Sequence, residues 1–152
     1  MFLTRTGARE MAVRLVFSLS ENPRDAREMI DETLSPEYYP TLRDEDELYV
    51  SRPKGEERDY LERIVIGVQE HLAELDRYIE KYAVGWQFHR ISRTAAAVMR
   101  VSMYETLYVP GVPVGVAINE AVELTKAYDT PETAAFVNGV LGAFVKSEVP
   151  VG

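Results

Sequence analysis

Few side chains in this sequence could do chemistry, and none stands in a catalytic or metal-binding pattern. The two histidines, His71 and His89, belong to no His-x-x-x-His or Glu-x-x-His pair, so we expect a structural or solvated role for each. The absence of cysteine excludes disulfides, thiolate metal sites and cysteine nucleophiles. No phosphate-binding glycine-lysine loop and no nucleophile elbow occurs. Acid-base chemistry stays open only through carboxylates from distant segments that the fold could bring together as a pair. We therefore predict no catalytic residue, no metal and no cofactor.

Two arginines, Arg5 and Arg9, stand one turn apart at the amino end of the first predicted helix. A helix amino terminus already carries partial positive charge, so these side chains add to an anion-attracting end. On charge spacing alone, ordinary solvated arginines are the favoured alternative.

Phe17 stands opposite the expected core face of the same helix. At 100° per residue it lies roughly 170° from the apolar stripe, with Val13 one turn before it. An aromatic at that position is either covered by another part of the chain or available to a partner, and the angle favours neither.

The composition predicts one domain, placed at residues 1–150. A chain of 152 residues buries roughly two-thirds of its unfolded surface, and 46% hydrophobic residues can fill a core. No apolar run reaches the length of a membrane span and no signal-peptide core is seen, so we expect a cytoplasmic protein without membrane contact. The net charge of -8 argues against nonspecific nucleic-acid binding. Residues 21–62 carry the whole excess, with 14 acidic against 6 basic residues, so a basic patch elsewhere stays open.

Apolar spacing predicts an all-α fold of about seven helices, without strand alternation or internal repeats. The segment capped by Ser92 is apolar almost all round, so it should be central. Residues 35–55, with three prolines and the acidic run Asp44–Glu47, are predicted to form a long loop insertion. The predicted helical segments are residues 5–20, a helix after Asn22 with Pro23 in its first turn and ending at Leu34, residues 56–82, 92–108 and 114–128, and a last helix that begins at Thr130-Pro131.

In the last third of the chain, an asparagine interrupts each of two helical apolar segments. Asn119 lies within Val116–Leu124, and Asn138 lies within Phe136–Leu141. In order and spacing these two segments, with several upstream motifs, resemble the NusB family of bacterial transcription antitermination factors. The upstream motifs are Ala8-Arg9-Glu10-x-Ala12 with Leu15 and Phe17, Trp86 with Arg90-Ile91, and Arg100-x-x-x-Tyr104-Glu105.

The resemblance implies a fold of two packed three-helix subdomains around a central helix, and a function without chemistry. Family members pair with NusE, a ribosomal protein, and bind the boxA element of single-stranded nascent RNA. The complex helps transcribing RNA polymerase to read through terminators, notably in ribosomal RNA operons. Some members self-associate, so a homodimer is a further option. Asn119 and Asn138 are expected to be structural, bonding the backbone or each other.

The resemblance also assigns two groups of surface residues. The implied RNA-binding residues are Arg5, Arg9, Lys126, Tyr128 and Glu132. The aromatic ring of Tyr128 is suited to stack on a base, although an aromatic that closes the core edge is an equal alternative. The implied partner-binding residues are Val13 and Phe17, together with His89 and Arg93 around the start of the central helix.

Departures from the family pattern leave two alternatives. Ala95-Ala96 replaces an acidic and a basic residue, and Ala135 replaces a lysine, so we expect weak RNA binding by this protein alone. The first alternative is a NusB-fold adaptor for protein–protein interaction with little RNA binding of its own. The second is a remnant of RNA cytosine methyltransferases that carry a NusB-like amino-terminal domain. We discount it because those enzymes need a following Rossmann-type domain, and the sequence reaches Gly152 with none.

Overall fold

The computed structural model describes residues 4–42, 46–49 and 51–150, and these residues form helices and connecting segments without a strand. Seven α-helices and three short 3-10 helices follow one another along the described residues. The predicted all-α class is therefore confirmed. The chain divides into two compact units, residues 1–69 and residues 70–152.

The first unit begins with α1 (Arg5–Glu21), whose first turn is capped by the side chain of Thr4. The buried surface of this helix is wider than the predicted apolar stripe. Val13, on the predicted outer face, is only 5% exposed. The expected single core face was too narrow. Small and β-branched side chains allow close packing on more than one side, which periodicity does not reveal. The buried residues are Ala8, Arg9, Met11, Ala12, Val13, Leu15 and Val16.

Helix α2 (Ala26–Thr33) starts later than predicted, because Asp25 and not Asn22 is its cap. The Asp25 carboxylate accepts a hydrogen bond of 3.0 Å from the backbone N–H of Glu28, which satisfies a first-turn donor. Pro23 therefore precedes the helix. The predicted buried residues of this helix are confirmed, namely Ala26, Met29, Ile30 and Leu34.

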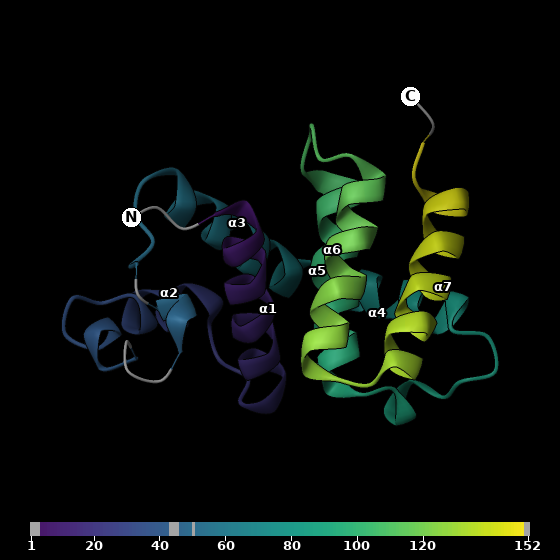
Figure 1. Cartoon of the computed structure of the whole chain (residues 1–152), viewed down its shortest axis with the longest axis horizontal. Helices are drawn as coiled ribbons and strands as arrows, with labels where there is room; N and C mark the ends of the chain where they lie inside the picture. Colours follow the sequence, from purple (N-terminus) through teal and green to yellow (C-terminus); the bar gives the residue numbers. More distant parts are fainter. Residues whose placement is uncertain (1–3, 43–45, 50, 151–152) are drawn as a thin grey trace. The chain divides into compact units, whose positions relative to one another are not determined.

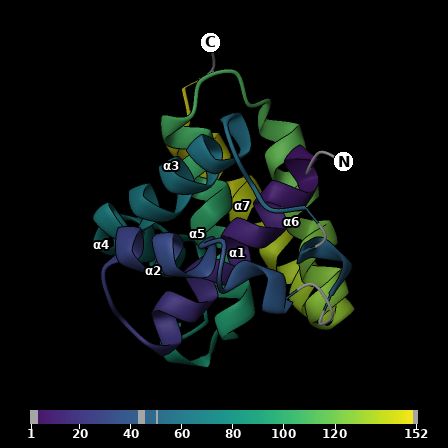
Figure 2. The ribbon, with the colours of Figure 1, turned by 90° about the vertical axis from the view of Figure 1, so that its left-hand side faces the viewer.

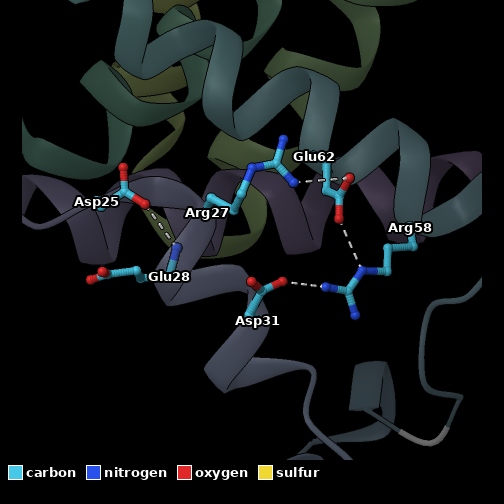
Figure 3. Close-up of polar contacts among 6 residues, drawn as sticks. All are labelled: Asp25, Arg27, Glu28, Asp31, Arg58 and Glu62. Carbon is cyan, nitrogen blue, oxygen red and sulfur yellow. Dashed lines mark hydrogen bonds and ion pairs between the residues drawn. The ribbon is translucent and has the colours of Figure 1, made fainter.

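Charged side chains link α2 to α3 (Glu56–Glu70), as Figure 3 shows. Arg58 lies 2.5 Å from Asp31 and 3.0 Å from Glu62, and Arg27 lies 3.8 Å from Glu62. Such solvent-facing ion pairs contribute about 0–1 kcal/mol each. They therefore set how the two helices align, while the buried apolar residues supply most of the stability.

The described residues of the 35–55 segment form no α-helix, as predicted, but they contain η1 (Tyr39–Leu42) and η2 (Glu47–Tyr49). Tyr39 is 2% exposed and its hydroxyl donates to the Ser51 carbonyl at 2.8 Å. Asp46 accepts a hydrogen bond of 2.8 Å from Arg14 of α1. Figure 2 faces this side of the unit and shows the segment in front of α1. The other half of the predicted acidic run, Asp44 and Glu45, lies outside the described residues.

The described residues of the second unit form four α-helices, three of which pack on the fourth, α5. Figure 1 shows α6 and α7 side by side, and both pack on α5. Residues 95–105 of α5 are all buried, so the predicted central helix is confirmed within this unit. Ser92 and Thr130 cap α5 and α7 as predicted, accepting hydrogen bonds from Ala95 and Thr133. The helices are α4 (Leu72–Tyr82), α5 (Arg93–Tyr108), α6 (Val114–Tyr128) and α7 (Pro131–Glu148), with the 3-10 helix η3 (Phe88–Arg90) before α5.

The prediction of one helix over residues 56–82 was wrong, because His71 separates α3 from α4. Its backbone leaves the helical region at φ -110° and ψ 18°. The His71 ring lies 4.4 Å from the Tyr108 ring and 5.7 Å from the Tyr104 ring, centroid to centroid. The apolar period runs from Val68 to Leu75 without a proline or glycine at the break, so the spacing alone gives no sign of it.

A buried arginine ties α4 to α5. The Arg100 guanidinium is 8% exposed and donates two hydrogen bonds to the Asp76 carboxylate, at 2.7 and 3.1 Å. Glu148 of α7 accepts hydrogen bonds from Lys81 and Tyr82 of α4. Charge-assisted contacts thus fix the helices that carry the surface residues of this unit.

The expected structural role of the two asparagines is wrong. Asn119 and Asn138 are both exposed, and neither side chain hydrogen-bonds to another residue that the structure describes. Apolar side chains make the buried surfaces of α6 and α7, which leaves the asparagines on the outer faces. The buried apolar residues are Ala117, Ala121 and Leu124 of α6, and Ala134, Val137, Val140, Leu141 and Phe144 of α7.

Candidate nucleic-acid and partner surfaces

The two arginines at the start of α1 have different environments. Arg5 is exposed, and its guanidinium carbon lies 4.1 Å from the centroid of the Tyr60 ring of α3. Arg9 is only 7% exposed. A guanidinium stacked on an aromatic face keeps N–H donors at its edge, so Arg5 can still donate to a phosphate. Arg9 stands among the buried residues of α1.

Further along α1, acidic side chains neutralise Arg14. It lies 3.2 Å from Glu10 and 2.8 Å from Asp46, and its guanidinium carbon is 5.3 Å from the centroid of the Tyr49 ring. A hydrogen bond from the backbone N–H of Leu48, together with Arg14, holds the pKa of Asp46 below its usual range. Asp46 therefore stays charged near neutral pH and reduces the positive field of α1.

The predicted partner-binding residues of α1 differ in accessibility. Val13 is buried at 5% exposure, whereas Phe17 is half-buried and keeps part of its ring at the surface. Phe17 is therefore the residue of this pair that a partner could contact without a change in α1.

In the second unit, the turn between α6 and α7 gathers three of the predicted RNA-binding residues. Lys126 is exposed and lies 3.3 Å from Glu123. Tyr128, the last residue of α6, is 43% exposed. Glu132 is exposed in the first turn of α7, where a carboxylate interacts favourably with the helix dipole. A cation and an accessible aromatic ring thus lie within one turn of helix.

Asp129 fixes the conformation of this turn. Its carboxylate accepts hydrogen bonds from the Ser92 hydroxyl at 2.8 Å and from the backbone N–H of Thr130 at 2.7 Å. Partial burial opposes the charge, but these hydrogen bonds and one with Thr133 outweigh it, so the pKa of Asp129 lies below its usual range. The start of α5 is thereby linked to the turn.

The remaining predicted residues lie near the start of α5. Arg93 is exposed as the first residue of this helix, and His89 belongs to η3, although its side chain lies outside the described part of the chain. Ala95 and Ala96 are 0% and 6% exposed, so packing explains why small residues stand there. Ala135, by contrast, is exposed.

One surface residue was missed as a site by reasoning from the sequence. Trp86 is 54% exposed in the loop between α4 and α5, and its ring centroid lies 5.0 Å from that of Phe136 in α7. Its signals in the sequence are its place in the family motif with Arg90-Ile91 and its position as the single tryptophan, directly after Gly85.

These surfaces define a small all-helical binding protein, with exposed cations and aromatic rings near helix ends. Among the described residues no group of three acidic or histidine side chains is placed to hold a metal ion. No helix in the described ranges combines the length and the apolar character needed to cross a membrane. The sequence model of the NusB family matches residues 6–146, and the chain belongs to that family.

Relatives named as transcription antitermination protein NusB match over nearly the whole chain. The relative from Thermoanaerobacter sp. (strain X514) is 35% identical over 146 residues, which cover 96% of this chain and 93% of the relative. The one from Lactiplantibacillus plantarum is 36% identical over 150 residues, covering 97% and 99%. This chain is thus a NusB-type transcription antitermination factor, a class of protein that acts without catalysis.

Solved structures show the same fold. T. maritima NusB superimposes with a TM-score of 0.78 at 26% identity, covering 98% of this chain and 96% of that one. The crystal structure of the antitermination factors NusB and NusE in complex with dsRNA contains a chain that matches with a TM-score of 0.75 at 21% identity, covering 97% and 99%.

Proposed function

We propose that this chain pairs with NusE, a ribosomal protein, to bind boxA-type single-stranded RNA. Through that complex it acts indirectly on transcribing RNA polymerase and favours readthrough of terminators, notably in ribosomal RNA operons. The observation that carries the proposal is the α6–α7 turn, where the 43% exposed ring of Tyr128 lies two residues from the exposed Lys126. The solved complex of NusB and NusE with dsRNA supports the pairing with NusE and RNA, because a protein of the same fold is in complex with NusE and with an RNA there.

The chemistry of the turn suits a flexible RNA strand. Proteins that bind single-stranded RNA combine cations that neutralise phosphates with aromatic rings on which bases stack. Lys126 supplies the first group and Tyr128 the second. Glu132, a hydrogen-bond acceptor, can select bases that present amino groups. Arg5 adds a phosphate contact from α1 in the first unit.

The charge of the chain makes the partner necessary. A net charge of -8 repels phosphates, and one of the two predicted RNA-binding arginines, Arg9, is buried. We therefore expect RNA to bind this protein weakly and the pair with NusE more tightly. Phe17, His89 and Arg93 are the residues assigned to that partner. Val13 is assigned to it as well, but its burial limits it to a supporting position.

The experiment is the fluorescence anisotropy of a labelled boxA-type RNA, titrated with this protein, with NusE and with both across a salt series. Tighter binding by the pair, with a slope of a few phosphate contacts, is the expected result. Equal binding by the pair and by NusE alone would contradict it. Sedimentation of this protein alone in the same buffers shows whether a homodimer competes with pairing.

The buried Arg9 and the neutralised Arg14 favour a second candidate, a NusB-fold adaptor that binds NusE without binding RNA. This candidate predicts a formed heterodimer and no gain in RNA affinity. The titration separates the two candidates, because sedimentation follows the heterodimer while anisotropy follows the RNA.

A further inference from the structure

The loop between α4 and α5 presents a tryptophan on a well-defined turn. The Trp86 backbone N–H donates to the Ala83 carbonyl at 3.0 Å. Gly85, inside this turn, has a φ of +83°, a conformation that residues other than glycine rarely adopt. Trp86 is 54% exposed although tryptophan is usually well covered. The backbone thus holds a large ring at the surface, so binding should cost little further conformational entropy.

Two contacts place this loop beside the α6–α7 turn within the second unit. The Trp86 ring lies 5.0 Å from the ring of Phe136, which follows Glu132 by one turn of α7. The Ser92 hydroxyl, at the end of the loop, donates to Asp129 at 2.8 Å. Figure 1 shows the loop passing next to the turn that joins α6 to α7. Trp86 therefore belongs to the same end of the unit as Lys126 and Tyr128.

The charge around this loop complements a polyanion. Residues 81–104 form the longest stretch of the chain without aspartate or glutamate, and they contain four basic residues. Two of these are engaged within the unit, Lys81 with Glu148 and Arg100 with Asp76. Arg90 is exposed before the α5 cap, and Arg93, which also interacts within the chain and is assigned to the partner, is exposed after it. In a chain with a net charge of -8 this stretch of sequence is locally positive, and a further acidic group, Asp129, contacts it at Ser92.

We propose that Trp86 stacks on a base of single-stranded RNA while Arg90 pairs with a nearby phosphate, extending the RNA surface of the α6–α7 turn. This inference rests on the proposed function. A flat ring on a fixed turn can stack on the face of any base, and an exposed cation on the same segment can pair with the RNA phosphates. A protein partner would need a wider apolar patch than Trp86 and Val84 provide.

The single tryptophan makes the proposal directly measurable in the wild-type protein. RNA stacked on Trp86 quenches its fluorescence, and no other residue of the chain contributes an indole signal. We expect quenching that saturates at the same concentration of boxA-type RNA as the anisotropy of the heterodimer. A titration of NusE alone supplies the background. Saturable RNA binding without quenching would overturn the stacking assignment.

Three variants separate stacking from charge. Trp86→Ala should weaken RNA binding about tenfold, the effect of losing one stacked base, without changing the salt slope. Trp86→Phe keeps an aromatic ring and should lose less RNA affinity than Trp86→Ala. Arg90→Gln should reduce the salt slope by about 0.7, the value for one phosphate of a single strand. Leu72→Ala removes an apolar side chain of the same unit that is 41% exposed, and it should leave RNA affinity unchanged.

The outcomes distinguish this inference from the proposed function. If the heterodimer binds RNA but Trp86→Ala binds equally well, the inference is wrong and the proposed function stands. If Trp86→Ala weakens pairing with NusE and not RNA binding, Trp86 belongs to the partner surface and the inference is again wrong. If the wild-type heterodimer binds no RNA, both fail. Circular dichroism of each variant verifies the fold, and the quenching experiment needs no variant.

Discussion

The amino end of α1 and the α6–α7 turn contain the same kinds of residue, but the chain uses them differently. At α1, the Arg5 guanidinium covers the ring of Tyr60, which is 6% exposed, at 4.1 Å. At the turn, the ring of Tyr128 is 43% exposed near the exposed Lys126. In the first region the cation and the aromatic satisfy each other, whereas in the second both face the solvent.

This difference separates two modes of RNA contact. A ring covered by a guanidinium cannot stack on a base, so the α1 region is restricted to phosphate pairing through Arg5. The second unit, with Tyr128 and Trp86 exposed, is suited to base stacking. Mutations in the two regions should therefore differ in kind, with salt dependence affected by α1 and salt-independent affinity affected by the turn.

The largest expected effect is on stability and comes from Arg9→Ala. Arg9 is 7% exposed, and truncating a buried long side chain removes packing as well as charge, so we expect a loss of about 1–3 kcal/mol in the free energy of unfolding. Urea denaturation should show a lower midpoint with an unchanged slope. The resemblance implies that Arg9 contacts RNA, whereas its burial predicts this loss of stability.

Arg5→Ala serves as the matched control, because it removes the same group from an exposed position one turn away. It should leave the free energy of unfolding, measured by urea denaturation, within about 0.5–1 kcal/mol of wild type, the range for an exposed cation–π contact. An Arg9→Ala protein of wild-type stability that binds RNA poorly would make Arg9 a direct RNA contact and remove the contrast between the two arginines.

The next effect is on affinity and comes from Tyr128→Ala at the turn. Losing a stacked base should weaken RNA binding by the heterodimer about tenfold, while stability changes by about 1 kcal/mol or less because Tyr128 is 43% exposed. Tyr128→Phe keeps the ring and should bind nearly as well as wild type. A large loss of stability in Tyr128→Ala, measured in the same urea experiment, would instead identify Tyr128 as an aromatic that closes the core edge.

Most of the helical fold could be predicted from the sequence, because caps and apolar period are local properties. Ser92, Thr130 and the helix over residues 114–128 were placed correctly from such signals. The break at His71 was not, because it depends on ring contacts with Tyr104 and Tyr108, distant in sequence. The α2 cap was also misplaced, because Asn22 and Asp25 are equally suitable cap residues by type.

The surfaces were harder to predict than the fold. Helical periodicity suggested that Val13 faces outward, but its burial depends on side chains distant in sequence. Arg9 and Arg5 have the same spacing signal and opposite exposure. Trp86 was assigned no site role because a tryptophan is usually well covered, and the sequence does not reveal that this one is 54% exposed. Burial is a tertiary property, so residue type and spacing could not resolve these cases.

A smaller effect should follow from Arg5→Gln. The substitution removes one cation from the α1 region and should lower RNA affinity about threefold, with a salt slope reduced by about 0.7. Anisotropy titrations at several salt concentrations measure both quantities. The same substitution should not alter tryptophan quenching at saturating RNA, since Trp86 belongs to the other unit. A changed affinity with an unchanged slope would mean that Arg5 acts through Tyr60 and not through a phosphate.

The smallest effect concerns the acidic segment and Arg14. The pKa of Asp46 is lowered in the folded protein from an ordinary value of 3.8, so its charge stabilises the fold above that pH and the contribution is lost as the pH falls through the lowered pKa. The Asp46 side chain is 41% exposed, so the contribution should be below about 1 kcal/mol. The stability difference between wild type and Asp46→Asn should therefore be constant above about pH 5 and shrink below about pH 4.

The same variant tests the comparison between the two regions. Asp46→Asn removes a negative charge beside Arg14 on α1, so a phosphate-binding α1 should gain RNA affinity, by less than about threefold, and the gain should vanish in high salt. Glu37→Gln makes the same change of charge at an exposed residue of the same segment and corrects for net charge. An equal gain in both variants would show that only the overall charge matters. A gain confined to Asp46→Asn would show that the acidic segment weakens one RNA-binding region while leaving the stacking region of the other unit unaffected.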